Sequence, residues 1–204
     1  RDGSYNHQDL LFINKSVKRH NSSDKKIVLT PYKRVASIIN NEVLNAINSK
    51  PLKFLANTVG KIKSDNIPAE ELLILKKGAK VMFVKNNRPL WVNGSLGEVV
   101  DFSKGKFMVK KDGIVLEVER ATWEEYKYKY DKDKGILSKI VIGSFTQYPL
   151  ILASAITVHK GQGATIDGVH INLDRGAFDY GQTYVALSRT KKLSDMSLER
   201  EIRH

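Results

Sequence analysis

Two clusters of polar residues toward the end of the chain carry side chains that could bind phosphate. The first reads His159-Lys160-Gly161-Gln162-Gly163, and the second runs from Gln182 to Arg189. Each follows an apolar run, as in α/β domains that present polar groups at the ends of parallel strands. A guanidinium stays charged and can bind phosphate oxygens with a rigid fork, but taken alone Arg189 is better explained as a surface residue at a helix end, where it favours the helix dipole.

The first cluster could also meet the backbone of a nucleic acid. Thr157, His159 and Lys160 come just past a predicted strand, where side chains and backbone N–H groups can contact phosphates. Gly161 and Gly163 allow positive φ and a close approach of the backbone to a ligand. An ordinary glycine turn with a structural histidine explains the same residues, so both interpretations stay open.

The composition points to a polyanionic partner. The 204 residues include 34 Lys and Arg against 22 Asp and Glu, a formal net charge of +12. Nucleic acid is the commonest polyanion, although charge does not separate DNA from RNA. A solubilising lysine surface is the alternative.

Several classes of protein are disfavoured by what the sequence lacks. It has no cysteine, and its five histidines show no paired spacing, so neither disulfides nor a protein metal site is predicted. No apolar run approaches the ~20 residues that span a bilayer, so no membrane partner is expected. The chain starts at Arg1 with no targeting pattern, which suggests a fragment of a protein from a bacterial cytoplasm or nucleoid.

A strand–helix unit is predicted near the N-terminus. Residues 27–29 form a short apolar run typical of a buried strand, and Thr30 and Pro31 suit an N-cap and a first helical position. Helical spacing continues to about Asn48 on one apolar face, formed by Val35, Ile38, Ile39, Val43, Ala46 and Ile47.

The middle of the chain predicts short antiparallel strands. Alternation over residues 114–119 is typical of a half-exposed strand, and Asn93-Gly94 and Asp112-Gly113 are hairpin turn signals. We therefore expect a small β-barrel over residues 78–145, inserted into an α/β domain formed by residues 1–77 and 146–204. Strands at 151–153, 155–158 and 169–173 and a helix from Gly181 to Ser188 complete the α/β part.

The order of these segments resembles the C-terminal half of superfamily 1B DNA helicases of the Pif/RecD-like group. The stretches that carry the resemblance are Leu29–Asn40, Lys77–Met82, Trp91–Gly94 with Gly97, Gly143–Leu150, Ala155–Thr165 and Gly181–Arg189. It implies a P-loop NTPase fold without the P-loop half, namely the second RecA-like domain with an inserted SH3-like barrel. In such helicases two RecA-like domains sandwich ATP and together grip single-stranded DNA.

The resemblance also implies roles for single residues. Arg189 matches the catalytic arginine finger, and Gln162, Gly163 and Gln182 would join it in binding ATP. Thr30, Asn93, Thr157, His159 and Lys160 would contact DNA, although capping explains Thr30 equally well and a hairpin turn explains Asn93 better. ATP and Mg²⁺ would be cofactors of the intact parent, and the partners would be single-stranded DNA and a preceding RecA-like domain.

The chain lacks the other half of an ATPase site. No G-x-x-x-x-G-K-[ST] occurs, and no apolar strand ends in an Asp-Glu pair. We therefore expect this chain alone to bind no cofactor and to hydrolyse no ATP. The alternative function is a non-catalytic nucleic-acid-binding module. In it some aromatic residues would stack on bases, although aromatics in a small barrel are more often core; they are Trp91, Phe107, Trp123, Tyr126, Tyr128 and Tyr130.

Overall fold

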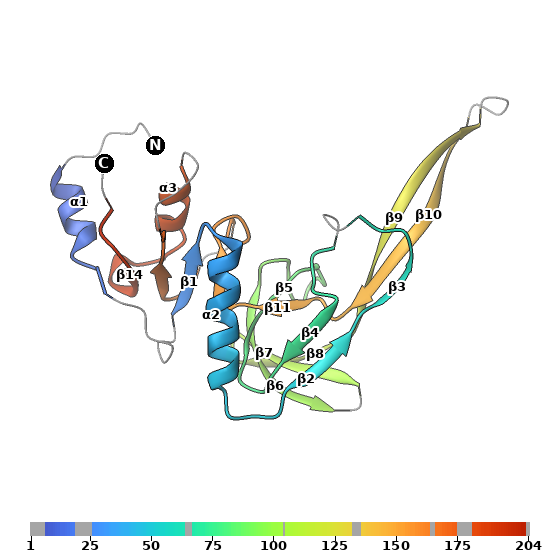
Figure 1. Cartoon of the computed structure of the whole chain (residues 1–204), viewed down its shortest axis with the longest axis horizontal. Helices are drawn as coiled ribbons and strands as arrows, with labels where there is room; N and C mark the ends of the chain where they lie inside the picture. The colour runs from blue at the N-terminus through green and yellow to red at the C-terminus, as the bar shows by residue number, and fades with distance from the viewer. Residues whose placement is uncertain are drawn as a thin grey trace. The chain divides into compact units, whose positions relative to one another are not determined.

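The computed structural model describes residues 7–18, 26–63, 67–103, 105–131, 136–163, 166–174 and 181–202. They divide into two compact units (Figure 1), one formed by Arg1–Ile47 with Leu152–His204 and the other by Asn48–Ile151. The domain limits expected from sequence, 77/78 and 145/146, remain a prediction. Each unit is described by itself.

A four-stranded parallel sheet forms the centre of the first unit. Its order is β12-β1-β13-β14, and its strands are β1 (Ile27–Thr30), β12 (Ala155–Thr157), β13 (Val169–Ile171) and β14 (Met196–Leu198). Every residue of these strands is buried, as expected of parallel strands covered on both faces. The apolar runs correctly predicted the first three, whereas β14 was not predicted.

Helices flank this sheet. They are α1 (His7–Asn14), α2 (Lys33–Ala46), α3 (Gln182–Leu187) and the 3₁₀ turn η2 (Leu193–Asp195). Figure 1 shows α2 alongside β1, and it packs on β1 and β12 through Ala36 and Ile39. None of the described helices is long and apolar enough to cross a membrane.

The start of α2 differs from the prediction. The helix begins at Lys33 with Tyr32 at the N-cap and no side-chain cap, so the roles expected of Thr30 and Pro31 are wrong. Thr30 is instead the last residue of β1, paired with Thr157. Because this pairing keeps the backbone extended through Thr30, the helix starts two residues beyond Pro31, the predicted first helical residue.

Asn40 sets which face of α2 packs on the sheet. Its Oδ1 accepts a hydrogen bond from the Ala155 N–H at 2.7 Å, and its Nδ2 donates to the Ala155 carbonyl at 2.8 Å. The side chain thus satisfies both backbone groups of a residue in the outermost strand, β12. The predicted apolar face is rotated accordingly, because Ile38 and Ala46 are exposed while Ala36 and Leu44 are buried.

The second unit is built from short sheets whose assigned pairings are antiparallel. Their orders are β3-β10-β9, β11-β5-β6-β7-β8 and β2-β4. The strands are β2 (Leu52–Leu55), β3 (Asn57–Gly60), β4 (Leu72–Leu75), β5 (Lys80–Phe83), β6 (Leu96–Ser103), β7 (Lys106–Lys111), β8 (Ile114–Val118), β9 (Ala121–Asp131), β10 (Ile136–Gln147) and β11 (Leu150–Leu152). The strands β2 and β3 fall in a basic segment for which no strand was predicted.

Packed aromatic rings and one buried amide hold these sheets together. The ring of Phe54 lies 4.8 Å from Phe107 and 5.1 Å from Tyr148, measured between centroids. The fully buried Gln147 places Nε2 at 2.9 Å from the Phe54 carbonyl and 3.2 Å from the Glu71 carbonyl. Since these carbonyls belong to β2 and to the residue before β4, Gln147 ties that ribbon to the end of β10.

We predict that Asn40→Leu lowers the free energy of unfolding by about 1–3 kcal/mol, because the Ala155 N–H and carbonyl lose their partners. Urea denaturation of the chain measures this change. Asn41→Leu is the matched control: Asn41 is exposed one residue further along α2, so the expected change is within about 0.5 kcal/mol. Equal unfolding midpoints for the two variants would contradict the role assigned to Asn40.

Candidate phosphate-binding site

The carboxyl ends of β1 and β12 lie side by side. Thr30 pairs with Thr157, and the Val158 N–H donates to the Thr30 carbonyl at 2.9 Å. Both threonines are buried, with exposed fractions of 0% for Thr30 and 8% for Thr157. Their hydroxyls accept backbone hydrogen bonds, from Tyr32 to Thr30 and from Lys160 to Thr157. The two side chains therefore hold the strand ends in place.

The loop after β12 forms a tight turn with its charged residues outward. The Gly161 N–H donates to the Thr157 carbonyl at 2.9 Å, and His159 and Lys160 are exposed. The predicted positive φ occurs at Gly163, where φ is 82°. Gly161 does not have a positive φ. A Cβ there would lie 3.2 Å from Leu29 Cδ2, so close packing explains this glycine.

Arg189 follows α3 and folds against the end of that helix. Its Nε donates to the Val185 carbonyl and its Nη2 to Ser188 Oγ, both at 2.9 Å. The Arg189 carbonyl accepts a hydrogen bond from the Ile166 N–H at 3.0 Å. Ile166 follows the first cluster in the sequence, three residues beyond Gly163, so the end of the second cluster pairs with the segment that comes after the first.

Gln182, the first residue of α3, is an isolated buried polar group. Its side chain is 4% exposed, and neither Oε1 nor Nε2 has a hydrogen-bond partner among the described residues. An unsatisfied buried amide costs about 1–3 kcal/mol, so its retention is explained if another molecule completes the pairing. The sequence selected Gln182 only by its place in the motif. That its amide has no hydrogen-bond partner among the described residues is seen only in the structure.

Asn93 lies in the second unit, in the loop between β5 and β6. Its backbone N–H donates to Asn86 Oδ1 at 2.7 Å, and the following Gly94 has a φ of 89°. These contacts are those of the predicted turn. The Asn93 side chain is exposed, so the contact with DNA remains a prediction.

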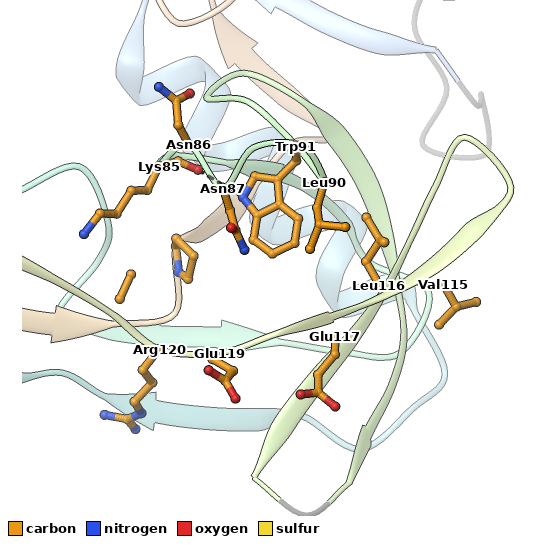
Figure 2. Close-up of a pocket in the computed structure, with 12 residues that line it drawn as sticks. Lys85, Asn86, Asn87, Leu90, Trp91, Val115, Leu116, Glu117, Glu119 and Arg120 are labelled. Carbon is orange, nitrogen blue, oxygen red and sulfur yellow. Dashed lines mark hydrogen bonds between the residues drawn. The ribbon is translucent and has the colours of Figure 1, made fainter.

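A hollow of about 650 Å³ opens beside this loop (Figure 2). Trp91 forms one wall; its indole N–H donates to the Lys85 carbonyl at 3.0 Å and its ring stacks on Phe83. Glu117 and Glu119 line the opposite side and pair with Lys106. The hydrogen bond from Lys106 to Glu117 is the main cause of a raised Lys106 pKa.

The aromatic residues considered for base stacking fall into two groups. Trp91 and Phe107 are buried in the second unit and pack as core, and Trp123 is half-buried near Phe145. Tyr128 and Tyr130 are exposed, and Tyr126 beside them is half-buried with its hydroxyl donating to Glu124. Core packing therefore explains the first group and not the second. Among the described residues, no group of three His, Asp or Glu side chains gathers that could hold a metal ion.

Comparison with known proteins defines the family. No family model matches the chain. The ATP-dependent DNA helicase Pif1 of Bdellovibrio bacteriovorus is 32% identical over 205 residues, covering 97% of this chain and 44% of the relative. Unliganded Pif1 from Bacteroides sp. superposes with a TM-score of 0.84 at 31% identity, over 98% of this chain and 47% of that one. The chain is a Pif1 helicase homologue.

Bacteroides Pif1 has also been crystallised with ADP-AlF3 and single-stranded DNA. That structure matches with a TM-score of 0.78 at 31% identity, over 98% of this chain and 46% of the Bacteroides chain. Our chain therefore spans about half the length of the Pif1 proteins it matches. The predicted helicase family is confirmed, whereas the roles of individual residues remain predictions.

We predict that Gln182→Met raises the free energy of unfolding of this Pif1 homologue by about 1 kcal/mol. A methionine of similar shape removes an unsatisfied buried amide and keeps the packing. Urea denaturation of the chain without ligand provides the measurement. Gln162→Met, at an exposed position, should change stability by less than about 0.5 kcal/mol. A Gln182→Met variant less stable than wild type would show that the amide is satisfied within the chain.

Proposed function

We propose that this chain is the second RecA-like half of an ATP-dependent DNA helicase that translocates on single-stranded DNA. Its parallel sheet would be the core of that domain, and an SH3-like barrel over residues 78–145 would be the insertion, lying within the second unit. The observation that carries the proposal is the hydrogen bond from the Ile166 N–H to the Arg189 carbonyl, which pairs the end of the second cluster with a residue that follows the first cluster in the sequence. Homology to Pif1 helicases, one solved with ADP-AlF3 and single-stranded DNA, supports it.

On the nucleotide side, the residues fit one face of an ATP site. Arg189 supplies a guanidinium, Gln182 an unsatisfied amide, and the loop at Gln162 and Gly163 an exposed backbone. The γ-phosphate, when bound, provides the phosphoryl group to be transferred to water, and Arg189 would leave its helix end to stabilise the charge on its oxygens. The described residues do not fit Mg²⁺, since no acidic cluster accompanies them. A preceding RecA-like domain would have to supply those ligands, so the isolated chain should be inactive.

On the DNA side, exposure divides the five predicted residues. His159 and Lys160 are exposed and would contact phosphates, while the buried Thr30 and Thr157 would position them by fixing the strand ends. Asn93 would contribute from the loop of the second unit. Because Ile166, which follows the first cluster in the sequence, is hydrogen-bonded to Arg189, a change at one proposed phosphate site would be transmitted to the other. A bacterial cytoplasm or nucleoid remains the proposed location.

The test is the DNA-stimulated ATPase activity of the intact helicase that contains this chain. We expect Arg189→Ala to lower kcat by about 10³-fold, because the transition-state charge loses its guanidinium, while DNA affinity is retained. Arg200→Ala serves as the control, since Arg200 contacts the Asp174 carbonyl and lies outside both clusters. An unchanged rate in Arg189→Ala would favour the alternative, a nucleic-acid-binding module without nucleotide chemistry.

A second prediction tests the DNA contact at Lys160. Lys160→Ala should weaken binding of oligodeoxythymidine and reduce the slope of log K against log salt concentration by about 0.7, the value for one phosphate contact on a single strand. Fluorescence anisotropy over a salt series gives both quantities. Lys192→Ala, at an exposed position after the second cluster, controls for the loss of one charge. The same slope in both variants would argue against a phosphate contact at Lys160.

A further inference from the structure

The strands β9 and β10 form a ribbon that extends beyond the sheets of the second unit. Figure 1 shows the two strands running side by side away from β5 and β6. They pair from Ala121 with Gln147 to Asp131 with Ile136, whereas β3 pairs with β10 over residues 143–146 alone. The outer ribbon, residues 126–131 and 136–141, therefore has no third strand among the described residues. A two-stranded ribbon with both faces in water is marginally stable.

One face of the outer ribbon is apolar and aromatic. Side chains alternate along a strand, and directly paired residues share a face, so the register defines what we call the tyrosine face. Its members are Tyr126, Tyr128, Tyr130, Leu137, Lys139 and Val141. Tyr128 is 62% exposed, Tyr130 58% and Leu137 62%. Clustered exposure of this kind marks an interaction site.

The chemistry of the tyrosine face favours nucleic acid over an apolar protein segment. The six members of the face include no acid, although Glu124, the preceding residue of β9 on this side, accepts a hydrogen bond from the Tyr126 hydroxyl. Lys139 Nζ lies 3.3 Å from the centroid of the Tyr126 ring. In sequence, residues 126–131 and 136–141 contain the three lysines Lys127, Lys129 and Lys139 and one acid, and Glu124 and Glu125 directly precede them. Aromatic rings on every second residue beside an excess of lysine are the combination by which proteins bind single strands without sequence preference.

We propose that the tyrosine face binds single-stranded nucleic acid, with bases stacked on Tyr128 and Tyr130 and a phosphate paired with Lys139. Lys127 and Lys129, on the reverse face, add positive potential around the strand. This surface is additional to the contacts proposed for His159 and Lys160, and it does not depend on nucleotide chemistry. The ribbon would then be a second binding surface for single-stranded nucleic acid.

The experiment measures binding of fluorescein-labelled oligodeoxythymidine to the full 204-residue chain at low salt. Loss of one stacking ring costs about 1–3 kcal/mol, so each of Tyr128→Ala and Tyr130→Ala should weaken binding by about 5- to 150-fold. Tyr128→Phe and Tyr130→Phe keep the ring and should bind like wild type. Ile140→Ala, on the reverse face of the same ribbon, is the matched control and should also bind like wild type.

A second experiment uses the wild-type chain, so its result does not depend on whether a variant folds. The chain is photocrosslinked to a DNA strand that contains 5-iododeoxyuridine. We expect crosslinked peptides that contain Tyr128 or Tyr130, and we expect them to persist in Lys160→Ala. Their persistence separates this proposal from the one on the first unit. Two results would overturn the proposal: wild-type affinity in both alanine variants, or crosslinked peptides that all lie outside the ribbon. So would alanine variants that change self-association in sedimentation and leave DNA binding intact, since the face would then bind protein.

Discussion

The parallel pairing of β1 with β12 is the constraint on which the first unit depends. Polar residues that follow two different strands can act together when those strands end at the same edge, and the pairing of Thr30 with Thr157 provides this. The strands are only four and three residues long, so few hydrogen bonds hold the register. A slip by one residue would turn the Thr157 side chain to the other face and remove the hydroxyl that accepts the Lys160 N–H.

Much of this arrangement was predictable from the sequence because buried parallel strands are continuous apolar runs. The runs at residues 27–29, 155–158 and 169–173 predicted β1, β12 and β13, and the helical spacing that follows predicted α2, although with a start two residues too early. Met196–Leu198 was missed because an alternation of three residues carries no clear period. The strands β2 and β3 were missed because their exposed faces are basic or polar and no turn signal separates them.

The errors within the site have one physical cause. Whether Thr30 caps a helix or ends a strand depends on Thr157, more than a hundred residues away in the chain. The isolation of Gln182 likewise depends on what packs around it, and local propensity contains no information on that. Residue type and motif order selected the candidate side chains, and their roles remain predictions. The structure then shows that Thr30 and Thr157 are buried at the base of the loop and that His159 and Lys160 are exposed.

The contact between Asn40 and Ala155 has a consequence for association between molecules. An outermost strand normally offers unpaired N–H and carbonyl groups to which a strand of another chain can add. In β12 the amide of Asn40 already occupies both groups of Ala155, in the manner of a one-residue strand. The sheet is thereby closed to edge-to-edge growth at this point without the use of charge or proline. Removal of that amide would expose a template for aggregation as well as weaken the fold.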